Sequence, residues 1–318
     1  MNILTLLATE PSVLILVVGI LGLIVGSFLN VVIYRLPIMM ECSFQQECAE
    51  FYQYNNNIDN FKKLIFLKKL GLEPRRIRQL FIATNFNVTS PKHCESFNLW
   101  MPRSRCPHCG HLITALENIP IISFIWQRGQ CTACHQAISL RYPLVEALSA
   151  ILAVSIAYRF GFGWPLLGAL ALTWALLAAS LIDFDHQLLP DSITLPLLWL
   201  GLFCNLFGLY TDIISAIIGA MAGYLLLWSV YWLFKLVTKK EGMGYGDFKL
   251  LAMLGAFLGW QQLPFIIFMS SLVGAVVGIF LVLRRGHDKN VPIPYGPYLA
   301  AAGWISLLWG SPFLIFSF

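Results

Sequence analysis

Charged residues are scarce in this sequence: Asp, Glu, Lys and Arg together make up 12% of its 318 residues. Soluble proteins carry about 25% charged residues, so the composition excludes an ordinary soluble protein. The hydrophobic content of 58% and the mean hydropathy of +0.72 favour a membrane protein. We predict an all-α polytopic membrane protein with about eight transmembrane helices, each able to cross about 30 Å of hydrocarbon. These spans lie near residues 12–35, 143–160, 165–183, 191–210, 213–236, 247–262, 264–283 and 296–317.

The first apolar stretch lacks the features of a secretory signal. No basic region precedes it, and no small-residue cleavage site follows it, so we expect residues 1–36 to remain as a transmembrane anchor. With the N-terminus outside, every Lys and Arg except Arg159 falls in an inner segment or at the nearer helix end. Cytoplasmic loops retain basic residues, so this is the predicted orientation. The net charge of +5 then reflects topology, and no nucleic-acid partner is predicted.

One large soluble insertion, residues 37–142, separates the anchor from the remaining predicted spans in residues 143–318. It shows no internal repeat and no low-complexity tract. Residues 61–70 combine helical spacing of apolar residues with four lysines, which fits a helix on anionic lipid or a solvated helix packed on its own domain. Asn87-Val-Thr89 matches a glycosylation sequon that would be inert in the cytoplasm.

Four of the eight cysteines form two CxxC pairs, Cys106 with Cys109 and Cys131 with Cys134. Two such turns can complete a tetrahedral thiolate site, and a reducing cytoplasm disfavours the alternative of disulfides. We therefore predict a cytoplasmic zinc-binding domain whose Zn²⁺ is structural, because protein ligands fill every position. A nearby histidine could replace one sulfur, and the other cysteines are interpreted as ordinary thiols. The candidate histidines are His108, His111 and His135.

Two aspartates stand out because charge at a membrane span costs about 3 kcal/mol. Asp183 closes one predicted span and Asp247 opens another, in Gly244-Tyr-Gly-Asp247, both at the predicted cytoplasmic boundary. Two close carboxylates cannot both ionise easily, so they share a proton, as in aspartic proteases. The glycines around Tyr245 would let an extended peptide approach Asp247. Asp247 could also simply cap its helix, and Asp191 is assigned to such a cap.

Other chemistries find less support. No Ser/His/Asp or Cys/His arrangement appears, since His186 is the only histidine near the membrane site and no motif places a serine beside it. An ion-coupled transporter would need acids deep within spans, whereas the span centres are uncharged. A zinc-domain membrane scaffold without catalysis explains the cysteines but gives no reason for the Gly-x-Gly-Asp motif.

With these motifs the chain resembles the bacterial type IV prepilin peptidases, or leader peptidase/N-methyltransferases, of the GxGD membrane aspartyl proteases. The resemblance covers nearly the whole chain and rests on sequences beyond those above. They are Gly26-Ser-Phe-Leu-Asn30, Tyr34-Arg-Leu-Pro37, Pro102-Arg-Ser-Arg-Cys106, Glu117-Asn-Ile-Pro120, Arg141-Tyr-Pro-Leu-Val-Glu146, Leu181-Ile-Asp-Phe-Asp-His-Gln-Leu-Leu-Pro-Asp191 and Pro294-Tyr-Gly-Pro297.

The resemblance implies that Asp183 and Asp247 are the catalytic acids, with Asp185 in a supporting role. It implies cleavage of a basic leader from prepilins and type II secretion pseudopilins after a glycine, at the cytoplasmic face of the bacterial inner membrane. The new N-terminal residue, usually phenylalanine, would be N-methylated from S-adenosylmethionine. No glycine-rich methyltransferase loop is present, so no residues are assigned to the methyl donor, and residues 51–90 have no assigned role. Membrane lipid is an expected partner, and a homo-oligomer is left open.

Overall fold

The computed structural model describes residues 3–54, 97–239, 243–285 and 294–310. Within these residues the regular structure is helical apart from two isolated β-bridges, which confirms the predicted all-α class. In chain order the helices are α1 (Ile3–Thr9), α2 (Pro11–Tyr54), η1 (Leu116–Asn118), α5 (Ile122–Trp126), α6 (Arg141–Phe160), α7 (Trp164–His186), α8 (Asp191–Leu206), α9 (Ile213–Thr238), α10 (Tyr245–Leu258), η2 (Trp260–Gln262), α11 (Leu263–Arg285) and α12 (Gly296–Trp309).

Five of the described helical stretches are long and apolar enough to cross a membrane, so the protein is polytopic. The other three predicted spans are shorter helices: α8 has 16 residues, and α10 and α12 have 14 each. A 14-residue helix is about 21 Å long, less than the hydrocarbon thickness of about 30 Å. Gly259 and Gly310, both at positive φ, end α10 and α12 early. The count of eight spans is therefore only approximate. The five stretches are Pro11–Cys48, Arg141–Phe160, Trp164–His186, Ile213–Thr238 and Trp260–Phe280.

The chain separates into two compact units, residues 1–34 with 104–318, and residues 35–103. In the second unit the buried Arg35 guanidinium donates to the carbonyl oxygens of Asn98 (3.0 Å) and Pro102 (2.5 Å). Cys42 is disulfide-bonded, so its interpretation as an ordinary thiol is wrong. The predicted helix at 61–70 and the sequon at 87–89 lie outside the described residues.

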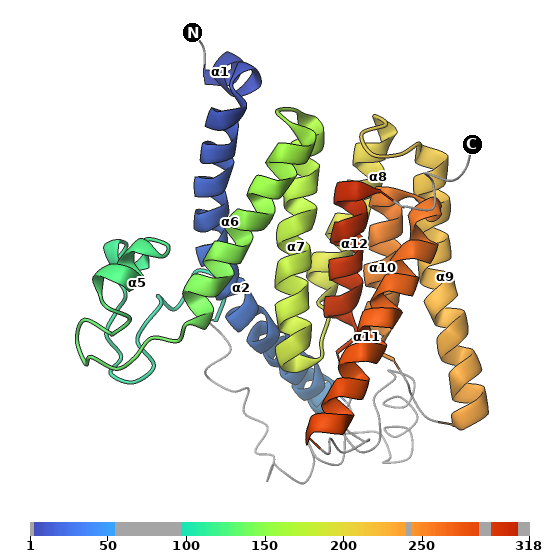
Figure 1. The fold of residues 1–318 in the computed structure, drawn as a ribbon. Helices are drawn as coiled ribbons and strands as arrows, with labels where there is room; N and C mark the ends of the chain where they lie inside the picture. The colour runs from blue at the N-terminus through green and yellow to red at the C-terminus, as the bar shows by residue number, and fades with distance from the viewer. Residues whose placement is uncertain (1–2, 55–96, 240–242, 286–293, 311–318) are drawn as a thin grey trace. The chain divides into compact units, whose positions relative to one another are not determined.

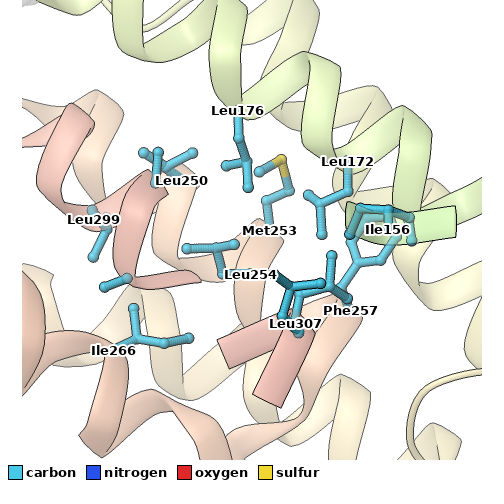
Figure 2. Close-up of a cluster of buried hydrophobic side chains, with 14 of the residues drawn as sticks. Ile156, Leu172, Leu176, Leu250, Met253, Leu254, Phe257, Ile266, Leu299 and Leu307 are labelled. Carbon is cyan, nitrogen blue, oxygen red and sulfur yellow. The ribbon is translucent and has the colours of Figure 1, made fainter. Parts of the chain in front are cut away.

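In the first unit, α12 packs against both α7 and α10, while α10 also packs on α8 and α9 (Figure 1). Figure 2 shows the core that these helices share with α6 and α11. Because α10 buries side chains all around its axis, it lies at the centre of the packing. The labelled core residues are Ile156, Leu172, Leu176, Leu250, Met253, Leu254, Phe257, Ile266, Leu299 and Leu307.

Glycines allow two helix pairs to approach at main-chain distance. A Cβ built on Gly219 of α9 would collide with the carbonyl oxygen of Gly255 in α10, so neither position has room for a side chain. Gly22 and Gly26 of α2 pack in the same way on α6, where a Cβ on Gly26 would lie 2.8 Å from Cα of Glu146. Small residues at helix contacts are typical of membrane proteins.

A polar contact fixes the far end of α10. The side-chain amide of Asn205, on α8, donates to the carbonyl oxygens of Ala256 (2.8 Å) and Phe257 (2.9 Å). These carbonyls belong to the last turn of α10, where the helix itself offers no partner. The buried Asn205 therefore satisfies the C-terminus of α10 and joins it to α8.

Candidate active site

The two predicted acids lie at helix ends inside the first unit, and both are buried, each with 6% of its surface exposed. Asp183 belongs to the last turns of α7, which stops where Gln187 adopts a left-handed conformation and donates its N–H to the Asp183 carbonyl (2.8 Å). Asp247 lies in the first turn of α10. The carboxyl groups are close enough that the charge on Asp183 acts on Asp247. The fold therefore brings together two acids separated by 64 positions, 247 minus 183, in the sequence.

A third element, the start of α12, holds Asp183. The backbone N–H of Gly296 donates to Asp183 Oδ2 at 3.0 Å. A Cβ on Gly296 would lie 2.6 Å from the same oxygen, so only glycine leaves space for the carboxylate. The positive end of the α12 dipole adds favourable electrostatics for a negative group. Sequence reasoning gave Pro294-Tyr-Gly-Pro297 no role in the site; its glycine-before-proline pattern was the only available signal.

The two glycines of the Gly-x-Gly-Asp motif serve different purposes. A Cβ on Gly246 would lie 2.6 Å from Cβ of Leu189, so the space at this glycine is taken by a side chain of the loop before α8. Among the described residues, a Cβ on Gly244 would meet only Asp247 Oδ2, at 3.9 Å, which leaves space beside the acid. Gly244 is the N-cap of α10, and its carbonyl oxygen accepts from the Asp247 N–H at 3.3 Å.

Each of the two neighbouring aspartates forms an ion pair with a basic side chain. Asp185 forms a bidentate ion pair with Arg141 at the start of α6, with Oδ1 3.0 Å from Nη1. Asp191 is the first residue of α8 and its carboxylate binds Lys249 Nζ at 2.6 Å. It makes no capping bond, because Pro190 takes the N-cap position and Lys249 draws the side chain away, so the prediction of a cap at Asp191 is wrong. Neither acid resembles the buried pair Asp183 and Asp247.

The four cysteines of the CxxC pairs meet in one cluster, with all sulfur atoms within 4.8 Å of one another. The Sγ atoms of Cys106 and Cys134 are 3.8 Å apart, and those of Cys109 and Cys131 are 4.0 Å apart. A tetrahedral zinc site with Zn–S bonds of about 2.3 Å requires sulfur separations of about 3.8 Å. A disulfide would need about 2 Å. The donor set and spacing therefore fit Zn²⁺.

The two CxxC turns have the same backbone design. Cys106 N–H donates to the His111 carbonyl, and Cys131 N–H donates to the Gln136 carbonyl, both at 2.9 Å. Hydrogen bonds from the backbone of Cys109 and His108 lower the pKa of the Cys106 thiol to about 7. Those from Cys134 and Ala133 lower the pKa of Cys131. Because a metal binds the thiolate, each turn favours the liganding form at its first cysteine. At Cys134, despite a lowering backbone hydrogen bond from Gln136, burial and the neighbouring thiols raise the pKa of the thiol to about 11.

Glu117 links the two turns from outside the cluster. Its carboxylate accepts from Thr132 Oγ1 in the second turn (2.5 Å) and from Thr114 N–H (2.8 Å), and it lies 3.2 Å from His111 Nε2. The bond from Thr132, followed by those from Thr114, lowers the pKa of Glu117 to about 2. Among the described residues, the metal-sized cluster contains the four cysteines and no histidine. The structure therefore favours four thiolate ligands over replacement of a sulfur by His108, His111 or His135.

Two family models match the chain. The bacterial peptidase A24 N-terminal domain matches residues 20–160, and the type IV leader peptidase family matches residues 170–279. Three similar relatives are each described as prepilin leader peptidase/N-methyltransferase. The protein of Stutzerimonas stutzeri is 52% identical over 96% of this chain and 93% of its own length. That of Pseudomonas aeruginosa is 51% identical over 98% and 95%, and that of Aeromonas hydrophila is 54% identical over 91% and 88%. No solved structure matches the chain.

Proposed function

Because this chain belongs to the type IV leader peptidase family, we propose that it removes the leader of type IV prepilins and type II secretion pseudopilins after a glycine, and then N-methylates the new N-terminal residue. The observation that carries the proposal is the buried pair Asp183 and Asp247, which interact although they come from different helices. Burial removes water that would screen the two charges, so the pair holds a proton between them more readily than exposed acids would.

We assign catalysis to this pair. The ionised carboxylate takes a proton from a water molecule while the protonated partner donates to the scissile carbonyl oxygen. The water oxygen then bonds to the carbonyl carbon and forms a tetrahedral diol. The acid that took the water proton passes it to the leaving nitrogen as the C–N bond breaks, and a hydroxyl of the diol returns a proton to the other carboxylate as the carbonyl re-forms. The Gly296 N–H keeps Asp183 oriented throughout, and the open space beside Gly244 gives the peptide backbone a path to Asp247.

We assign Cys106, Cys109, Cys131 and Cys134 to a structural Zn²⁺. The sulfur spacing fits the ion, and four protein ligands leave no position for a substrate. The ion therefore stabilises the fold of its turns and takes no part in cleavage. S-adenosylmethionine would supply the methyl group. Among the described residues no strand precedes a glycine-rich turn, so we assign no residue to this donor.

We propose that the protein lies in the bacterial inner membrane with the aspartates at the cytoplasmic face, as the distribution of Lys and Arg supports. The proposed domains are an anchor (1–36), a cytoplasmic zinc domain (37–142) and a transmembrane protease domain (143–318). Prepilins, pseudopilins and membrane lipid are the proposed partners, and no nucleic acid is expected. Self-association is open to measurement by the mass of the purified protein in detergent.

The decisive experiment uses purified protein with a purified prepilin, with and without S-adenosylmethionine, followed by mass measurement of the product. We expect leader removal in both reactions and the added mass of one methyl substitution only with the donor. An uncut prepilin in both reactions would contradict the peptidase. A cut but unmethylated product with the donor present would contradict the second activity alone.

A further inference from the structure

The segment between the two CxxC turns exposes five large apolar side chains, which are here called the α5 face. Neither η1 nor α5 buries a residue, although α5 has the sequence Ile-Ser-Phe-Ile-Trp. Ile125 is 69% exposed and Trp126 is 85% exposed. Exposed apolar clusters of this kind mark surfaces that contact a partner or a membrane. The face consists of Leu116, Ile119, Ile122, Ile125 and Trp126.

The polar groups beside this face are satisfied internally. Ser123 Oγ donates to the Ile119 carbonyl oxygen at 2.7 Å, and the Ile121 N–H donates to Glu146 Oε2 at 2.8 Å. The Phe124 ring packs over Gly129, where a Cβ would lie 3.0 Å from Cζ of the ring. An element with satisfied polar groups and outward apolar side chains costs little to place against lipid, whereas in water its apolar surface is unfavourable.

The bond to Glu146 fixes where the α5 face lies. Glu146 is on the second turn of α6, a candidate membrane span, and only 8% of it is exposed. Its partner Ile121 is the N-cap residue of α5, so α5 begins directly beside this helix. At the same height on α6, Leu144 and Leu148 are exposed on the face turned away from Glu146, as expected for side chains that meet lipid. The α5 face therefore begins beside the end of a candidate membrane span, near the predicted cytoplasmic boundary.

The basic side chain next to Trp126, rather than the net charge of the segment, indicates the kind of lipid, because four thiolates around one Zn²⁺ outweigh the arginines. Residues 104–140 contain Arg105 and Arg128, both exposed, and Glu117 as the one acid. The Glu117 carboxylate is held by Thr114 and Thr132. Arg128 follows Trp126 by two residues. A tryptophan with a nearby basic side chain is the combination that favours the headgroup region of an anionic bilayer.

We propose that the α5 face lies in the anionic lipid interface at the membrane side where α6 begins. Ile122, Ile125 and Trp126 contact the boundary of headgroups and acyl chains, and Arg128 binds lipid phosphates. The zinc-binding turns are thereby attached to the membrane at a second point besides the start of α6. This surface uses none of the groups assigned to cleavage, so it stands independently of the proposed activity.

The test uses the full-length protein labelled with 5-fluorotryptophan in nanodiscs that contain anionic lipid. The fluorine resonance of Trp126 is assigned by its loss in Trp126→Phe, and the other tryptophans serve as internal references. We expect a lipid-attached nitroxide to broaden this resonance beyond detection and a water-soluble gadolinium chelate to leave it sharp. The reverse pattern would overturn the proposal. Broadening by neither reagent would also overturn it, because the face would then be covered by protein.

Two variants separate the parts of the proposal. Ile125→Asp places a charge on the α5 face, so we expect Trp126 to become sensitive to the gadolinium chelate while zinc content stays unchanged. If zinc is lost, Ile125→Ser replaces it as a milder polar variant. Arg128→Gln should weaken the nitroxide effect in anionic nanodiscs and leave it unchanged in zwitterionic ones. An equal effect of Arg128→Gln in both lipids would refute the role of the anionic headgroups.

Discussion

The sulfur cluster and the aspartate pair are built in opposite ways. The cluster comes from residues 106–134 and depends on two short turns whose own backbone N–H groups bind the sulfurs. The aspartate pair needs α7, α10 and the start of α12, and each carboxylate owes its position to a different helix end. A local site of this kind requires only its turns to fold, whereas the aspartate site exists only in the packed bundle.

The sulfur cluster is expected to contribute to stability, and the aspartate pair is expected to contribute to catalysis. Losing a sulfur should remove the ion and unfold its turns, because the metal supplies much of their folding free energy. Losing a carboxylate should remove catalysis and leave packing intact, because the carboxylates contribute charge to a core that is otherwise apolar. Variants at each site should therefore have distinct signatures.

The largest effect is expected at the acids. Asp183→Asn and Asp247→Asn should each lower the rate of prepilin cleavage by at least about 10²–10⁴-fold, the contribution usual for general acid–base catalysis. The helical circular dichroism and zinc content should match the wild type. Asp185→Asn is the matched control, since its carboxylate is already paired with Arg141, and it should retain most activity. Wild-type cleavage by either of the first two variants would remove the dyad.

The next effect concerns the sulfur cluster. The double variant Cys106→Ser, Cys131→Ser should lose about one zinc ion per chain, measured by metal analysis of the purified protein. Cys204→Ser is the control, because that buried thiol lies on α8 outside the cluster. It should keep its metal. Unchanged zinc content in the double variant would exclude the assigned ligand set.

A smaller effect is expected from Gly296→Ala. The new methyl group would lie 2.6 Å from Asp183 Oδ2, so the carboxylate or α12 has to move. Misplacement of a catalytic group by about 1 Å costs about 10²-fold in rate. We expect kcat to fall by about that factor with little change in KM. Cleavage at the wild-type rate would mean that the Gly296 contact does not position Asp183.

The smallest effect distinguishes the two glycines of the motif. Gly246→Ala should lower the free energy of unfolding by about 1–3 kcal/mol, the usual cost of overpacking, because its methyl group would meet Leu189. Gly244→Ala should leave stability nearly unchanged, since only Asp247 is in reach, and should raise KM if the peptide passes there. Thermal unfolding followed by circular dichroism, together with steady-state kinetics, measures both. Equal destabilisation by the two variants would contradict the difference.

Much of this arrangement could be predicted from the sequence because it depends on local patterns. The length of the apolar stretches predicted the long helices, and the CxxC spacing predicted that four cysteines would form one cluster. Both features are encoded within a few tens of residues. What escaped prediction depends on contacts between distant segments. Examples are Gly296 against Asp183, Leu189 against Gly246, and Lys249 drawing Asp191 out of a capping role. Helix ends set by positive-φ glycines also made two predicted spans shorter than expected.

The contact between Gly219 and Gly255 has a mechanical consequence. Because the main chains of α9 and α10 are in contact at these glycines, α10 cannot rotate or slide past α9 without a collision of backbone atoms. Asn205 binds the C-terminal end of α10, which is the end opposite Asp247. A helix of about 21 Å held in this way is a stiff support. We therefore expect any adjustment that fits a substrate between the acids to come from α7 and α12, with Asp247 as the stationary half of the proposed catalytic pair.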